Sequence, residues 1–125
     1  MLNRLFSAGA LPALEAMLTF ASSRQRTIAT NIANVDTAGY RTRDRSESDF
    51  QGRLARAFRG LASSPGVPEG LAADAGILKP NGNNVDLEIE MAKMVRNSAL
   101  HSTAAALLAQ QFAMLREAIA GHVIS

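Results

Sequence analysis

Few side chains in this chain of 125 residues are suited to catalysis, and none of them forms a recognisable catalytic arrangement. The two histidines, His101 and His122, lie outside any Ser/Asp arrangement typical of nucleophilic catalysis. His101 falls on an apolar helical stripe, where packing is the simpler interpretation, and His122 lies near a predicted helix end, where a cation is favoured. The absence of cysteine excludes thiol catalysis, disulfides and zinc–cysteine sites. We therefore expect a protein that is not an enzyme and has no catalytic residues.

Three acidic residues, Asp86, Glu88 and Glu90, alternate at the start of a predicted helix and invite comparison with a metal site. A spacing of two does not place them on one helical face, and the helix dipole stabilises carboxylates in a first turn. The asparagine-rich residues 81–86 lack the ligand order and closing glutamate of an EF-hand. No glycine-rich phosphate loop follows a strand either. We therefore expect no metal ion and no cofactor.

The composition is that of a folded chain with a thin core. Hydrophobic residues make up 47% of the sequence, aromatic residues 5% and charged residues 19%. No uncharged apolar run approaches the roughly 18 residues that a membrane helix needs, so we expect no membrane insertion. Arg4 and the apolar stretch after it resemble a weak signal peptide, but Glu15 interrupts that stretch. We therefore expect no cleaved signal.

The strongest periodic pattern lies near the C-terminus and predicts a helix over residues 86–120. Its apolar stripe repeats at alternating spacings of four and three, as in a coiled coil. The stripe consists of Leu87, Met91, Met94, Ser98, His101, Ala105, Leu108, Phe112, Leu115 and Ile119. Asp86 is a suitable N-cap for this helix, and Gly121 is its expected stop.

A second pattern of the same kind predicts an N-terminal helix over residues 10–35. It consists of Leu11, Leu14, Leu18, Ala21, Gln25, Ile28, Ile32 and Val35. Residues 36–84 are expected to contain a turn, a short helix over 47–59 and a loop rich in glycine and proline.

The two long helices are predicted to fold back on each other as an antiparallel pair. We therefore expect one all-α domain, residues 1–125, with a loop-rich middle. The predicted seam between the helices consists of Leu14, Leu18, Gln25, Ile28, Ile32, Met94, His101, Leu108, Phe112 and Leu115. In this register Gln25 lies opposite His101, so the polar break in one seam faces the polar break in the other.

Each long helix also carries apolar residues outside the seam. We expect these to form an outer packing stripe that consists of Met17, Phe20, Leu100, Leu107 and Met114. A two-helix hairpin buries one stripe per helix, and leaving five large apolar side chains exposed forfeits on the order of 10 kcal/mol. Packing on other chains is the first interpretation. The alternative is that the short middle helix covers part of the stripe.

The basic residues gather in the middle of the chain. Residues 24–59 contain eight arginines against four acidic residues, whereas residues 60–125 have a net negative charge. This asymmetry fits head-to-tail pairing between copies, and it equally fits two solvated faces. A nucleic-acid-binding module is a rival interpretation, with arginines on phosphates and Tyr40, Phe50 and Phe58 interleaved. The phenylalanines, however, fit an apolar helix face better than stacking platforms. A coiled-coil adaptor that forms a finite dimer is a third possibility.

Two segments resemble one known family. Residues 28–41 read IATNIANVDTAGYR and resemble the N-terminal signature of bacterial flagellar rod and hook proteins. Residues 83–92 read NNVDLEIEMA and, together with Asn97 and Ser98, are similar to the C-terminal half of the proximal rod members. The sequence departs from the family pattern at Ala38, where proline is usual, and at His101, where tyrosine is common.

The resemblance implies a structural subunit of the proximal rod of the flagellar basal body. Such subunits polymerise through their terminal helices into a helical tube that transmits torque between the inner-membrane ring and the distal rod. The implied partners are other rod proteins, the rod-to-ring adaptor and the flagellar type III export apparatus, with no role for nucleic acid. The implied location is the periplasm, reached without a cleaved signal.

The signature also has a local physical interpretation. Asn31 and Asn34 share a face at the end of a helix, where short amides satisfy free carbonyl groups, and Tyr40 is predicted to fold back onto that helix. The candidate residues of this joint are Asn31, Asn34, Asp36, Thr37, Gly39, Tyr40, Asn84 and Asp86. A helix stop within one chain and a joint between subunits both remain open.

Overall fold

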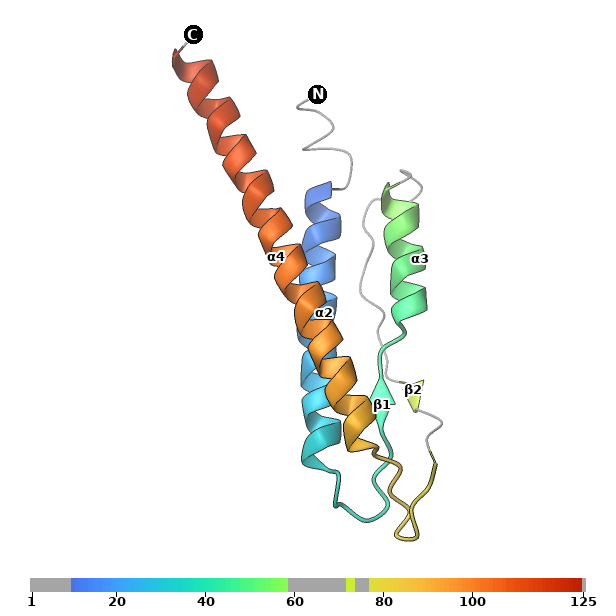
Figure 1. Ribbon diagram of the computed structural model, residues 1–125. Coiled ribbons are helices and arrows are strands. Elements are labelled where there is room, and N and C mark those ends of the chain that lie inside the picture. The colour runs from blue at the N-terminus through green and yellow to red at the C-terminus, as the bar shows by residue number, and fades with distance from the viewer. Residues whose placement is uncertain (1–9, 59–71, 74–76, 125) are drawn as a thin grey trace.

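The computed structural model describes residues 10–58, 72–73 and 77–124, and most of them are helical (Figure 1). The elements are α2 (Ala10–Ala33), β1 (Arg43–Asp44), α3 (Glu47–Phe58), β2 (Ala72–Ala73) and α4 (Leu87–Ile124). Helices α2 and α4 pack side by side in opposite directions, and the longer α4 continues past the start of α2. The short α3 lies along another side of α2. This arrangement confirms the predicted all-α fold with an antiparallel pair of terminal helices.

The strands β1 and β2 form a two-stranded antiparallel ladder. Arg43 lies opposite Ala73, and Asp44 lies opposite Ala72. The ladder is too short to form a layer of the fold. Its importance is positional, because β1 lies against α2 and carries the chain from the signature turn to α3.

Side-chain caps fix where α3 and α4 begin. Asp86 Oδ1 accepts hydrogen bonds from the backbone N–H groups of Glu88 (3.1 Å) and Ile89 (3.3 Å). Ser46 Oγ accepts one from the backbone N–H of Asp49 at 3.1 Å. Each cap satisfies helix donors that have no partner within the helix.

The predicted helix stop at Gly121 is wrong, because α4 continues through this residue to Ile124. A glycine that ends a helix adopts a left-handed conformation with positive φ. Among the described residues, only Gly39 and Gly82 have a positive φ. Gly121 therefore keeps the helical conformation.

The apolar core lies where α2 meets α4 and α3. Its buried members are Ala13, Leu14, Phe20, Ala21, Ile28, Phe50, Val85, Ala104 and Leu115. The rings of Phe20 and Phe50 stack with centroids 4.2 Å apart and an interplanar angle of 5°. The assignment of Phe20 to the outer packing stripe is therefore wrong, since α3 covers it with Phe50.

The seam on α4 differs from the predicted one by about one residue. Buried positions on this helix include Glu90, Asn97 and Ala104, whereas His101 is exposed and Phe112 is 48% exposed. Placing His101 and Phe112 in the seam was therefore wrong. The physical reason is that Glu90 and Asn97 find hydrogen-bonding partners on α2, which an apolar pattern cannot reveal.

The other predicted seam positions lie on the facing sides of the two helices. Leu14, Ile28 and Leu115 are buried. The half-buried members are Leu18, Gln25, Ile32, Met94 and Leu108.

Candidate functional site

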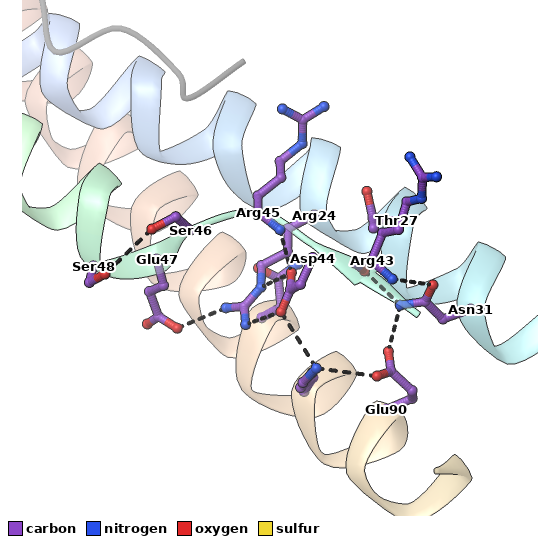
Figure 2. A network of polar contacts seen from close by, with 12 residues as sticks. Arg24, Thr27, Asn31, Arg43, Asp44, Arg45, Ser46, Glu47, Ser48 and Glu90 are labelled. Atoms are coloured by element: carbon purple, nitrogen blue, oxygen red, sulfur yellow. Dashed lines mark hydrogen bonds and ion pairs between the residues drawn. The ribbon is translucent and has the colours of Figure 1, made fainter. Parts of the chain in front are cut away.

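The side chain of Asn31, near the end of α2, makes four hydrogen bonds. Its Nδ2 donates to the backbone carbonyl of Arg43 (2.8 Å) and to Oε2 of Glu90 (3.0 Å). Its Oδ1 accepts from the Tyr40 hydroxyl (2.8 Å) and from the backbone N–H of Arg43 (3.2 Å). An asparagine side chain offers two donor hydrogens and two acceptor lone pairs, so Asn31 uses its full capacity. It joins α2, the segment after the turn, and α4 at one point (Figure 2).

Asn83 holds the end of α2 from the other side. Its Nδ2 donates to the backbone carbonyls of Asn34 (2.9 Å) and Thr37 (2.7 Å), and its Oδ1 accepts from the backbone N–H of Val85 (2.7 Å). The Asn83 side chain is fully buried, so these bonds satisfy groups that water cannot reach. Asn83 therefore fastens the segment before α4 to the turn after α2.

Asn84 continues this fastening one residue later. Its Oδ1 accepts a 2.6 Å hydrogen bond from the backbone N–H of Thr42, and its own N–H donates to the Tyr40 carbonyl at 3.3 Å. Thr42 and Asn84 are both buried. The two sequence segments that carry the family resemblance, 28–41 and 83–92, thus bind each other within one chain.

The signature turn itself is compact. Asn34 Nδ2 donates to the Thr30 carbonyl (2.8 Å), Thr37 Oγ1 donates to Asn34 Oδ1 (3.0 Å), and Gly39 N–H donates to the Asn81 carbonyl (2.9 Å). The Tyr40 hydroxyl reaches back to α2, as the sequence predicts. Burial raises the pKa of Tyr40, with a further rise from the charge of Glu90 and an opposing effect from Arg43. Its hydroxyl therefore remains protonated and able to donate.

A charge network continues from Asn31 along β1 and α4 (Figure 2). Glu90 is only 1% exposed and accepts a hydrogen bond from Lys93 Nζ at 3.2 Å. Lys93 Nζ also lies 3.6 Å from Asp44 Oδ2. Asp44 in turn receives two hydrogen bonds from Arg24, at 3.0 and 2.9 Å. The free NH1 group of Arg24 donates to Glu47 at 2.9 Å.

The network alternates in charge, and this alternation controls the ionisation of its members. Burial alone would raise the pKa of Asp44, but the hydrogen bonds and charge of Arg24, the backbone N–H of Arg45 and the charge of Lys93 hold that pKa below its ordinary value. Burial tends to lower the pKa of Arg24, and the Asp44 and Glu47 carboxylates raise it above its ordinary value. Arg24 and Asp44 are therefore both charged in the neutral range, and a buried charge needs such partners.

A smaller polar cluster lies at the middle of the helix pair. Asn97 Nδ2 donates to the Ala21 carbonyl (2.7 Å) and to Gln25 Oε1 (2.8 Å), and Gln25 Nε2 donates to Ser98 Oγ (3.3 Å). The predicted pairing of Gln25 with His101 is wrong by about one helical turn. The Asn31–Glu90 contact sets the register of the two helices and places Asn97 beside Gln25 instead.

The residues that the structure describes offer no centre for metal chemistry. No group of three or more His, Cys, Asp or Glu side chains in residues 10–58, 72–73 and 77–124 is arranged to hold an ion. Nor does any helix in these ranges have the length and apolar character to cross a membrane. The role of the joint is structural, because it holds α2 and α4 in one register.

Comparison with known proteins gives this joint a family context. A sequence profile described as "Flagella basal body rod protein" matches residues 13–41, which contain α2 from its second turn and the signature turn. Flagellar basal body rod protein FlgB of Borrelia hermsii is 31% identical over 112 residues, covering 73% of this chain and 81% of that protein. The chain belongs to the FlgB family of flagellar basal body rod proteins. It is a structural subunit of the basal body, where it assembles with other basal-body components, and not an enzyme.

The FlgB-family signature has a visible intrachain role. Asn31, Asn34 and Tyr40 bond within the chain, whereas Asp36, Thr37 and Gly39 are exposed at the turn. Asp86 is exposed and caps α4. The local interpretation as a helix stop therefore holds for part of the signature, and the exposed residues remain candidates for contact with a second subunit.

Sequence reasoning missed several residues of the joint, of the charge network and of the polar cluster at the middle of the helix pair. These are Arg24, Asp44, Asn83, Glu90, Lys93 and Asn97. Asn83, Glu90 and Asn97 lie in the segment that carries the family resemblance, which was an available signal. Arg24, Asp44 and Lys93 gave no such signal, since charged residues in a helix or loop are usually exposed.

The structure also bears on the nucleic-acid interpretation. Phe50 is buried and its ring is stacked on Phe20, so it cannot stack on a base. The side chain of Phe58 lies outside the described residues. A main aromatic candidate for nucleic-acid contact thus belongs to the core of this rod protein.

Proposed function

We propose that this chain polymerises through its terminal helices in the proximal rod and there helps to transmit torque between the inner-membrane ring and the distal rod. The observation that carries the proposal is the apolar surface of α4. Large hydrophobic residues exposed on this helix are Leu87, Ile89, Met91, Val95, Leu107, Phe112, Met114 and Ile119. Completing their burial is worth on the order of 10 kcal/mol, which is comparable to the stability of a whole small domain.

The exposed residues of α4 lie on both sides of its contact with α2. Leu107 and Met114 are seven residues apart and share one side of the helix, each with 43% of its surface exposed. Phe112 and Ile119 are also seven apart, and Phe112 lies five positions after Leu107. At about 100° per residue, the two pairs point roughly 140° apart. A subunit with apolar surface on two sides can contact a neighbour on each, as a heterologous assembly requires.

The outer packing stripe keeps part of its proposed role. Leu107 and Met114 are exposed, whereas Met17 and Leu100 are half-buried beside the helix pair. We therefore assign contact with neighbouring subunits chiefly to Leu107 and Met114.

The decisive experiment replaces one exposed apolar residue by a charge in the flagellated bacterium. Leu107→Asp and Met114→Asp should abolish recovery of the chain in purified basal bodies and stop swimming, because a buried carboxylate without a partner opposes assembly. Gln110→Asp is the matched control, since Gln110 is an exposed polar residue of α4. Cellular and exported amounts of all three variants should equal wild type. Normal incorporation and swimming of Leu107→Asp and Met114→Asp would refute the proposal.

The proposal includes a route and a set of partners. The chain would leave the cell through the flagellar type III export apparatus without a cleaved signal, and would meet other rod proteins and the rod-to-ring adaptor in the periplasm. The family resemblance supports this assignment. Intact mass of the chain from purified basal bodies tests the route, because a cleaved signal would remove a defined N-terminal segment.

A coiled-coil adaptor that forms a finite dimer is the alternative. Analytical ultracentrifugation and electron microscopy separate the two, since a finite dimer gives one discrete mass and no ring or filament.

A further inference from the structure

A basic cleft of about 320 Å³ lies between α2 and the segment that contains β1. Its cationic lining comes from Arg26 on α2 and from Arg43 and Arg45 on β1 and just after it. Ser23, Thr27 and Thr30 line its α2 wall. The cleft lies apart from the exposed apolar residues of α4, and it borders the polar joint at Tyr40 and Arg43.

Side chains of an extended chain alternate between its two sides, and this alternation explains why the arginines gather at the cleft. Successive side chains of a strand point to opposite faces. Thr42 is buried and Asp44 binds Arg24 in the charge network, so both face the interior. Figure 2 shows Arg43 and Arg45 extending to the other side, away from α4. Arg43 and Arg45, two positions apart, thus extend to the same outer side of this segment.

Arg26 and Arg43, two of the cations of the cleft, are not neutralised by the charge network. The ion pairs of that network use Arg24 and Lys93, and neither Arg26 nor Arg43 has a carboxylate partner among residues 10–58, 72–73 and 77–124. The hydroxyls of Thr27 and Thr30 already donate to helix carbonyls, at 3.2 and 2.8 Å. The guanidinium groups of Arg26 and Arg43 are therefore the main donors that the cleft offers to an anion.

We propose that this cleft binds the acidic start of α4 of a second copy of this chain, with Glu88 as the principal carboxylate. The inference rests on the proposed polymerisation and assigns one of its contacts. A heterologous interface needs two different and complementary patches on the same subunit, and the chain has both. Glu88 is exposed, and its neighbours Leu87 and Ile89 are 42% and 51% exposed, so charge and apolar surface occur together at this end. Arginine binds a carboxylate through two parallel hydrogen bonds, which fixes orientation as well as charge.

Phosphate groups of a nucleic acid are less well matched to the cleft. Three arginines give few phosphate contacts, and Tyr40 is the one aromatic ring among the described residues of the lining, whereas a single-stranded binding groove stacks successive bases on several rings. Tyr40, which borders the cleft, uses its hydroxyl to hold Asn31. A peptide carboxylate therefore fits better than a nucleic acid.

Site-directed cross-linking tests the contact. Because the chain has no native cysteine, only the introduced cysteines of this chain can react. Cells should produce Arg43→Cys and Glu88→Cys chains together, and their basal bodies should be treated with a short bismaleimide. This reagent spans the distance between paired long side chains, which a disulfide cannot. We expect a dimer between the two variants, and none from either variant alone. The double variant should give a ladder of higher oligomers. Arg56→Cys with Glu88→Cys is the control pair, because Arg56 is exposed on α3, outside the cleft.

A charge change provides the second measurement. Arg26→Glu, added to the Arg43→Cys chain, should lower the cross-linked fraction about tenfold because it places like charges together. Arg56→Glu in the same background should leave the fraction unchanged.

The outcomes separate this inference from the proposed function. If both cysteine variants are recovered in basal bodies but no dimer forms, the contact is refuted and polymerisation stands. If the wild-type chain is missing from basal bodies, the proposed function itself fails. If the purified wild-type chain shifts a labelled DNA or RNA and Arg26→Glu/Arg43→Glu abolishes the shift, phosphate replaces the second copy as the ligand and the inference is overturned.

Discussion

Asn31 on α2 donates a 3.0 Å hydrogen bond from Nδ2 to Oε2 of Glu90 on α4, and both side chains are almost completely buried. A buried carboxylate is costly unless donors compensate for lost water. Glu90 has two such partners, Asn31 and Lys93. The contact therefore does more than join two helices, because it is a condition for burying Glu90 at all.

Asn31→Ala should destabilise the chain by about 1–3 kcal/mol, since it removes one of the two donors of Glu90 and the bonds of Asn31 to the backbone of Arg43. The measurement is the free energy of unfolding from urea denaturation of the purified chain.

Asn34→Ala is the matched control, because its Nδ2 bonds only to the Thr30 carbonyl of its own helix and its Oδ1 serves the exposed Thr37. Its cost should stay below about 1 kcal/mol. Equal losses for Asn31→Ala and Asn34→Ala would show that the link to Glu90 contributes nothing.

The charge network predicts a loss of stability in acid that depends on Asp44. Its pKa in the folded chain is lowered, so the unfolded chain binds the proton more readily. The stability that Asp44 contributes is complete above its unfolded pKa of about 3.9 and is lost as the pH falls through the folded value. Asp44→Asn should therefore be less stable at neutral pH by about 1–3 kcal/mol and should lose less on acidification.

Urea denaturation at several pH values between about 6 and 2.5 measures this difference. Asp49→Asn is the control, because Asp49 forms an exposed i,i+4 pair with Arg53 at 3.3 Å. It should keep the wild-type pH dependence and cost less than about 0.5 kcal/mol. An Asp44→Asn chain with the acid sensitivity of wild type would contradict the network.

The fold was accessible from the sequence because apolar periodicity and caps are local signals. The N-cap role of Asp86 and the bounds of α3 follow from residues within a few positions of each other. The register of α2 against α4 could not be predicted from such local signals. It depends on Glu90 and Asn97, polar residues that a hydrophobic pattern assigns to the surface, and on partners 59 and 76 residues away.

The burial of Phe20 shows that an apolar pattern has a similar limit, because it does not identify the partner that covers an apolar residue. The pattern correctly indicated a second apolar face on α2, but it could not decide between a neighbouring chain and the chain's own α3. Only the position of Phe50, 30 residues later, settles this choice. The joint could be predicted only in part. The signature indicated that Asn31 and Tyr40 belong together, but it did not reveal Glu90 as a partner of Asn31.

The turn at the joint should depend on two glycines in the left-handed region. Gly39 has φ of 75° and Gly82 has φ of 81°, and the two residues touch, since a Cβ on Gly82 would lie 3.4 Å from Gly39 Cα. A non-glycine residue pays about 1–2 kcal/mol for this conformation. Gly39→Ala and Gly82→Ala should each destabilise the chain by that amount in urea denaturation. Gly52→Ala, in helix α3 with open space around its Cβ, should instead stabilise it by about 0.5–1 kcal/mol. The expected changes in the free energy of unfolding therefore have opposite signs for the turn glycines and for Gly52. Stabilisation by Gly39→Ala would contradict the prediction. It would mean that Gly39 adopts a negative φ in solution and does not keep its hydrogen bond to the Asn81 carbonyl.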